Sequence, residues 1–197
     1  MQKLLLLILT VALVSCRSGR SSYRATDMSA GLLRNVIAEC PLEVRETAVD
    51  MIRKYGQPYE MTSTRLTWEN NGPWLKTVVA LNEMTQDSPE PRWDFLEQTI
   101  SYKASADKYD ILTRFDAKVT ADKVKGTLTA KSDKEELNLL ALNLAHDIIS
   151  GKRTVQDAND QYAWGEIQFR KGRTAVYMQG LQFVTSLGEG NKNVSKQ

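Results

Sequence analysis

One apolar segment restricts the possible folds of this chain more than any other feature of its 197 residues. Residues 136–149 read ELNLLALNLAHDII, and their aliphatic side chains recur on nearly every side of a helix. A helix without a polar face has to be enclosed by other elements, so we expect it at the centre of the core. Ser132 followed by Glu135 matches a capping box, which predicts that this helix begins at Ser132 and runs to Gly151.

Periodic apolar residues predict four further helices, at 32–38, 42–55, 105–116 and 154–169. Gly56 and Pro58 follow the second of them and are typical of a helix end. Ser105 is expected to cap the third helix, and Thr154 with Asp157 the fourth.

Alternating apolar and polar residues predict strands at 64–70, 74–81, 95–104, 117–131 and 176–184. The turn signal Asn70-Asn71-Gly72-Pro73 joins the first two strands into a hairpin, and Gly126 marks a bend in the fourth. The two prolines of 86–93 predict a loop. Helices and strands do not alternate regularly, which favours an α+β fold with a mostly antiparallel sheet packed against the central apolar helix and further helices, in a single domain.

Composition excludes several classes of function. The chain has 26 basic and 24 acidic residues, a net charge of +2, and no basic stretch of the kind that binds nucleic acid. Its single histidine and two cysteines are too few for a multi-histidine or multi-cysteine zinc site. Neither a P-loop nor a dinucleotide-binding glycine motif is present, so no metal, nucleotide or other cofactor is predicted.

The N-terminus has the form of an export signal. Lys3 is followed by an unbroken apolar run from Leu4 to Val14, which is well short of the ~20 residues that a membrane-spanning helix needs. A short basic region and a short apolar region are typical of a signal that is cleaved during export.

The end of this signal resembles the lipobox of bacterial lipoproteins. The residues Leu13-Val14-Ser15-Cys16 carry the likeness, with Ser15 where glycine or alanine is commonest. The resemblance implies that Cys16 is lipidated and becomes the first residue of the mature chain, while an ordinary secretory signal with an accidental cysteine is the alternative. Arg17, in place of an aspartate, points to the outer membrane, facing the periplasm.

The predicted organisation follows from these boundaries. We expect a signal peptide at 1–15, a lipidated flexible tether rich in Ser, Gly and Arg at 16–29, one α+β domain at 30–188, and a frayed tail at 189–197. A segment from Lys54 to Trp68 is similar to small envelope lipoproteins with a β-lactamase-inhibitor-protein-like unit. The stretch from Glu136 to Phe183 also resembles bacterial envelope proteins, and neither likeness implies further site residues.

Few residues suggest catalysis. His146 lies inside the apolar helix, where a histidine bonded to a backbone carbonyl is commoner than a catalytic one. Acidic residues gather at the starts of two predicted helices, where the helix dipole explains them; they are Asp133, Glu135, Glu136, Asp157 and Asp160. No catalytic, cofactor-binding or metal-binding residue is therefore predicted, and Cys16 is the one modification site.

The remaining cysteine and most of the four tryptophans are expected in the core. Cys40 is predicted to be a free, buried thiol. Three of the tryptophans are expected in the core, with Trp93 the best candidate for exposure; the others are Trp68, Trp74 and Trp164. We therefore expect a membrane-anchored envelope lipoprotein whose domain is a non-catalytic binding or structural module, with an envelope protein or the cell wall as the candidate partner. The alternative is an envelope hydrolase that uses Asp or Glu.

Overall fold

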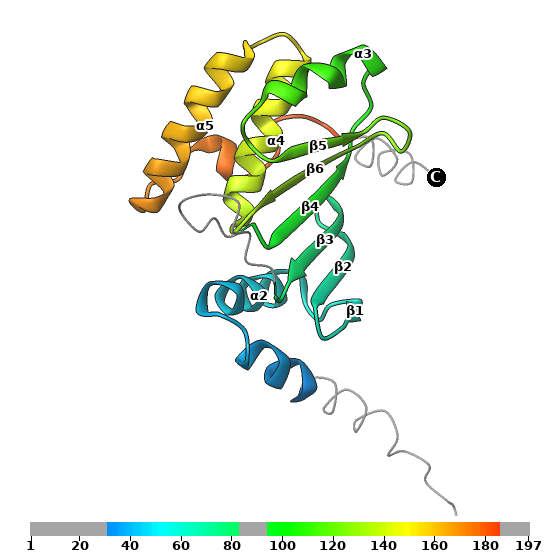
Figure 1. Cartoon of the computed structure of the whole chain (residues 1–197), viewed down its shortest axis with the longest axis vertical. Coiled ribbons are helices and arrows are strands. Elements are labelled where there is room, and N and C mark those ends of the chain that lie inside the picture. Colours follow the sequence, from blue (N-terminus) through cyan, green and yellow to red (C-terminus); the bar gives the residue numbers. More distant parts are fainter. Residues whose placement is uncertain (1–30, 83–93, 186–197) are drawn as a thin grey trace, which may run out of the picture. The chain divides into compact units, whose positions relative to one another are not determined.

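A six-stranded antiparallel sheet is the frame of the computed structural model, which describes residues 31–82 and 94–185 (Figure 1). The strand order is β1-β2-β3-β4-β6-β5, so only the last hairpin departs from the order of the chain. The described residues from Val36 onward belong to one compact unit. The strands are β1 (Glu60–Met61), β2 (Arg65–Asn71), β3 (Trp74–Ala80), β4 (Leu96–Ser101), β5 (Val119–Asp122) and β6 (Thr127–Ser132).

The predicted first hairpin is confirmed. β2 and β3 are joined at Gly72-Pro73, and Asn71 pairs with Trp74 on either side of this two-residue turn. Gly72 has a φ of 68°, a left-handed conformation that glycine adopts without steric cost. The hairpin points one tryptophan from each strand, Trp68 and Trp74, into the protein interior.

The predicted long strand at 117–131 is wrong in one respect. It is two strands, β5 and β6, joined by a tight turn. Asp122 stabilises this turn, because its Oδ1 accepts hydrogen bonds from the backbone N–H groups of Val124 and Lys125. The same hydrogen bonds lower the pKa of the Asp122 carboxyl group. Gly126, expected to mark a bend, takes a φ of 65° and closes the turn.

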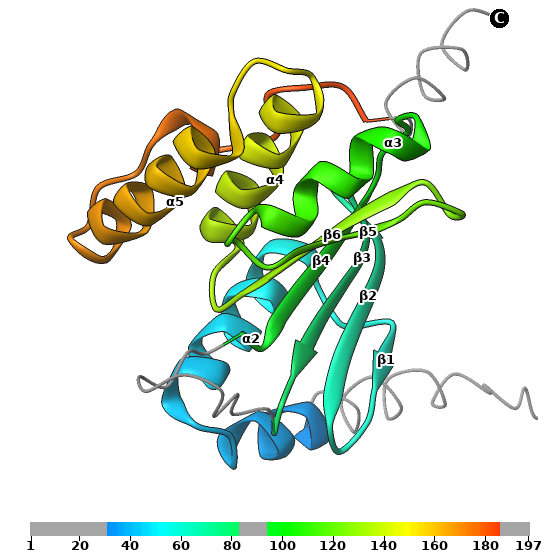
Figure 2. The ribbon, with the colours of Figure 1, turned by 45° about the horizontal axis from the view of Figure 1, so that its top comes forward.

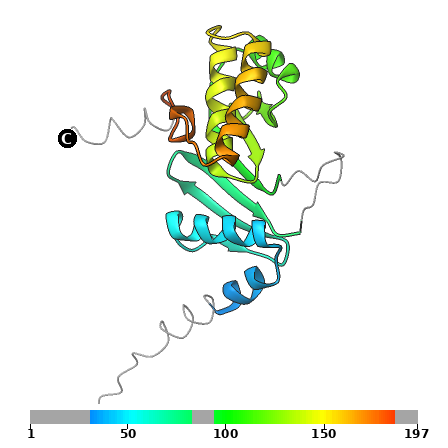
Figure 3. The same cartoon turned by 90° about the vertical axis from the view of Figure 1, so that its left-hand side faces the viewer.

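Helices cover one face of the sheet. α2 (Leu42–Tyr55) and α4 (Glu135–Ile149) cover different parts of it and run in different directions (Figure 3). The buried Gln98 of β4 contacts both, through Met51 of α2 and Asn138 of α4. α5 (Val155–Arg170) packs on α4 as a further layer (Figure 2). The remaining helical segments are 31–38, α3 (Ala106–Tyr109), η1 (Asp110–Arg114) and η2 (Val176–Met178).

α4 is the central core helix that the sequence predicts. All of its residues are buried except Glu136 and His146. Together with the mixed helices and the antiparallel sheet, this arrangement confirms the predicted α+β fold.

The start of α4 differs from the prediction. The helix begins at Glu135 after Lys134, with no side-chain cap, so the proposed capping box is wrong. Ser132 is the last residue of β6, and its Oγ lies 2.8 Å from Asn138 Oδ1, inside the protein. Its register in the sheet turns this side chain inward, where it is no longer available to cap the helix.

The predicted last strand, 176–184, is also wrong. The segment forms η2 and irregular structure because a side chain of α4 forms hydrogen bonds with its backbone groups. Asn143 Nδ2 donates to the carbonyl oxygens of Tyr177 and Gly180, each at 2.9 Å, and its Oδ1 accepts from the N–H of Gln182 at 2.7 Å. These groups are therefore not free to join a strand ladder.

The other predicted elements agree more closely. The helices at 32–38, 42–55 and 154–169 form, and Thr154 Oγ1 accepts the predicted capping bond from the N–H of Asp157. The helix at 105–116 is one α-helical turn and a 3₁₀ segment, and Ser105 makes no side-chain cap. The loop at 86–93, the signal, the tether and the tail lie outside the described residues. No described helix is long and apolar enough to cross a membrane.

Candidate functional site

The described residues contain four buried carboxylates, which are the first groups to consider because the hydrolase alternative requires acidic residues. One of them, Asp94, pairs with Lys118, and the other three lie at or near α4. The first is Glu135, whose side chain is 6% exposed. Its Oε1 accepts hydrogen bonds from Tyr55 Oη at 2.6 Å and Trp74 Nε1 at 2.9 Å, and its Oε2 lies 3.1 Å from Lys54 Nζ. Burial, followed by the bond to Glu135, raises the pKa of the Tyr55 hydroxyl. This carboxylate joins α2, β3 and α4.

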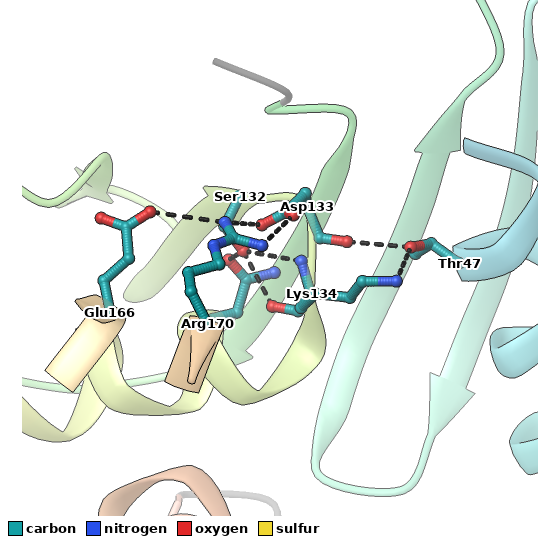
Figure 4. A network of polar contacts seen from close by, with 7 residues as sticks. Thr47, Ser132, Asp133, Lys134, Glu166 and Arg170 are labelled. Carbon is teal, nitrogen blue, oxygen red and sulfur yellow. Dashed lines mark hydrogen bonds and ion pairs between the residues drawn. The ribbon is translucent and has the colours of Figure 1, made fainter. Parts of the chain in front are cut away.

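The second carboxylate, Asp133, precedes α4 (Figure 4). Arg170 at the end of α5 donates to both of its oxygens, at 2.6 and 2.8 Å, and this bidentate bond raises the pKa of the guanidinium. The backbone oxygen of Asp133 accepts from Thr47 Oγ1 at 2.9 Å, and Lys134 Nζ donates to the same hydroxyl at 3.1 Å. Thr47 is 1% exposed, so this lysine and threonine pair is structural.

The third carboxylate, Asp147, lies near the end of α4. Its Oδ2 accepts from Arg153 Nε at 3.0 Å and from Tyr177 Oη at 2.7 Å, and the latter bond raises the pKa of the Tyr177 hydroxyl. Arg153 also donates to Asp157 at 2.7 Å. Asp147 thereby ties together α4, the start of α5 and the segment that carries η2.

These three carboxylates are structural ion-pair and hydrogen-bond acceptors. A general acid or base needs a free oxygen that faces a substrate, whereas these oxygens face cations and hydroxyls from neighbouring elements. Helix-dipole reasoning therefore missed the main role of Asp133 and Glu135, which only the tertiary contacts reveal. Within the described ranges, no three His, Cys, Asp or Glu side chains gather as a metal site would require.

His146 is a partly buried residue at the edge of the core. Its Nδ1 lies 3.0 Å from Tyr102 Oη, and its ring stacks on Phe183 with centroids 4.3 Å apart. The predicted backbone-carbonyl partner is thus replaced by a tyrosine hydroxyl. Burial lowers the pKa of the imidazole and raises that of Tyr102 to about 12. The contacts hold the C-terminal segment against α4.

Cys40 is a buried thiol, as the sequence predicts. Its Sγ donates to the carbonyl oxygen of Val36 at 3.3 Å, and burial raises its pKa.

We expect Cys40 to react slowly with a thiol reagent at neutral pH in the native protein, since burial disfavours the thiolate. In denaturant it should react rapidly. Titration with a chromogenic disulfide of the lipidated chain, in which Cys16 carries a thioether, should then count one thiol. A count of zero in denaturant would mean that Cys40 is modified or bonded to another molecule.

The tryptophans divide differently from the prediction. Trp68 and Trp74 are buried, and their Nε1 atoms donate to Gly56 O and Glu135. Trp93 lies outside the described residues. Trp164, expected in the core, is 57% exposed on α5. The sequence around Trp164 gives little signal for this, because α5 is only weakly amphipathic.

Trp164 borders the most apolar of the hollows described. This hollow has a volume of about 160 Å³ and lies between α5 and η2, over side chains of α4. Gly165 lies at its base, where an added Cβ would come within 2.7 Å of Leu140 Cδ2, so the glycine permits the close approach of α4 and α5. The lining residues are Leu140, Leu144, Arg153, Gln161, Trp164, Gly165, Ala175, Val176 and Tyr177.

We call the exposed rim of this hollow, with the next turn of α5, the α5–η2 surface. It consists of Trp164, Ile167 and Val176, which are 57%, 52% and 62% exposed. Large apolar side chains exposed side by side are typical of a binding surface. Two larger hollows are more polar, one beside α3 and the start of α5 and one on the uncovered face of the sheet.

Comparison with known proteins adds no relative. No family model, curated protein or solved structure matches the chain.

Proposed function

We propose that this chain is a lipid-anchored cell-envelope protein whose domain acts by binding and not by catalysis. The lipobox-like sequence at residues 13–16, directly after the short apolar run, is the observation that carries the proposal. Lipidation of Cys16 would attach the domain to a membrane through the tether at 16–29. The outer membrane, facing the periplasm, is the proposed location.

The architecture supports binding over acid–base hydrolysis. Three of the four buried acidic groups in the described residues, Asp133, Glu135 and Asp147, hold α2, α4, α5 and the η2 segment together, and the fourth, Asp94, pairs with Lys118. The α5–η2 surface, in contrast, exposes three large apolar side chains to solvent. Exposed Trp and aliphatic side chains supply contact area for a partner and no reactive group.

Replacing Cys16 by serine should prevent lipidation, because the acceptor sulfur is lost. The variant should no longer incorporate a radiolabelled or alkyne-tagged fatty acid. In addition, either the uncleaved precursor should accumulate or the domain should be released from membranes. Labelling followed by fractionation of cells measures both. Cys40→Ser is the matched control, and it should retain the label. An unlabelled wild-type protein would overturn the anchoring proposal.

A further inference from the structure

Two cationic side chains, Lys171 and Arg173, follow the apolar α5–η2 surface at the end of α5. Trp164 and Ile167 are three residues apart on the helix, and Lys171 follows Ile167 by four, so the three share a face. Val176 borders the same hollow as Trp164. Arg173 Nη1 donates to Gln168 Oε1 at 2.6 Å, which places this guanidinium one turn from Trp164.

The acidic side chains of α5 each bond to a neighbour other than Lys171 or Arg173. Asp157 accepts from Arg153, Asp160 from Gln156, and Glu166 from Arg170. Lys171 and Arg173 are both exposed at the C-terminal end of the helix. The surface therefore presents a tryptophan and two aliphatic side chains next to positive charge.

We propose that the α5–η2 surface rests on an anionic lipid bilayer; this inference rests on the proposed lipid anchor. Tryptophan prefers the interface between lipid headgroups and hydrocarbon, and lysine and arginine beside it attract anionic headgroups. A hollow of about 160 Å³ is too small for a typical small-molecule ligand, whose pockets start at roughly 300 Å³. An anchor that already holds the domain at the bilayer makes a weak contact sufficient, because the second binding event is then intramolecular.

Quenching of tryptophan emission by brominated lipids tests this contact. The full lipidated chain is reconstituted into vesicles of phosphatidylcholine and phosphatidylglycerol, with or without bromine on the acyl chains. The wild-type emission should be quenched by the brominated lipid, and Trp164→Phe should lose more than half of the quenched part. Lys171→Gln with Arg173→Gln should weaken quenching in the anionic vesicles and have little effect in vesicles of phosphatidylcholine alone.

A second variant serves as a matched control. Val124, 98% exposed in the β5–β6 turn, is replaced by tryptophan in the Trp164→Phe chain, which moves the exposed indole away from α5 with the anchor unchanged. Quenching should not return. Equal quenching of the wild type and Trp164→Phe would overturn the proposal, and so would full quenching of this control. A photocrosslinker at position 164 that labels protein but no lipid would also overturn it. Each sample is first checked for the lipid label, so a labelled chain without quenching refutes the surface contact and leaves the anchor proposal standing.

Discussion

Replacing Leu144 by alanine is expected to lower the free energy of unfolding by ~2–5 kcal/mol. Leu144 is 1% exposed in α4, between the sheet and α5, and it forms part of the floor of the hollow beside Trp164. Its removal would leave a cavity that the surrounding helices close only in part. Since a domain of this size is stable by roughly 5–15 kcal/mol, the loss is a large fraction of the total.

Denaturant unfolding followed by far-ultraviolet circular dichroism measures this difference. His146→Gln, two residues along the same helix, is the control. It removes the bond to Tyr102 and the stacking on Phe183 and should cost only about 1 kcal/mol. A nearly neutral Leu144→Ala would contradict the assignment of α4 as the core helix. Normal folding of His146→Gln with loss of an enzymatic activity would revive the hydrolase alternative.

Replacing Glu135 by alanine is expected to destabilise the protein by about 1–3 kcal/mol. The loss is not larger because Lys54 is mostly exposed and Trp74 Nε1 keeps Tyr55 Oη as a second acceptor at 3.0 Å. The change removes the acceptor that Tyr55 Oη and Trp74 Nε1 share. Trp74 is fully buried, so its N–H would be left without that partner in the protein interior. Loss of one partner from a buried polar cluster costs more than the net gain from forming it, because the remaining groups stay desolvated.

Two further variants isolate this effect. Glu135→Gln keeps an oxygen at the end of a side chain of the same length and should recover most of the stability. Glu136→Ala removes the neighbouring carboxylate, which belongs to the same helical turn but is not fully buried, and should change stability by less than about 0.5 kcal/mol. If Glu135→Ala and Glu136→Ala are equally mild, the buried cluster has no role in stability.

The elements that could be predicted are those whose pattern is strong and local. α4 is recognisable because its aliphatic residues surround the helix, and α2 because an apolar stripe ends at Gly56. The β2–β3 hairpin is recognisable from Gly72-Pro73 between two alternating segments. In each case the residues that decide the structure are neighbours along the chain.

The errors arise where a distant residue decides. Ser132 is a good helix cap by sequence, but pairing of β6 with β4 places it beside Asn138 inside the protein. Residues 176–184 alternate like a strand, yet Asn143 binds their backbone groups. Side chains of one element that satisfy the backbone of another leave no periodic signal.

The candidate site was less predictable than the fold. Trp164 lies on a helix whose apolar residues are spread around it, so neither its exposure nor its position beside Val176 follows from spacing. The partners of Asp133, Glu135 and Asp147 come from residues up to 86 positions away, as for Thr47 and Asp133. Only the packing of α4 against its neighbours brings these groups together.

The two ion pairs that join α4 and α5 also fix how these antiparallel helices can move. Asp133 binds Arg170 at one end of the pair, and Asp147 binds Arg153 at the other, while Gly165 meets Leu140 between them. Sliding α5 by one helical turn, about 5.4 Å, would break both ion pairs at once and push side chains of α5 against Leu140. The helices therefore keep their register. A force on Trp164 would move α4 and α5 together and would not slide one helix along the other.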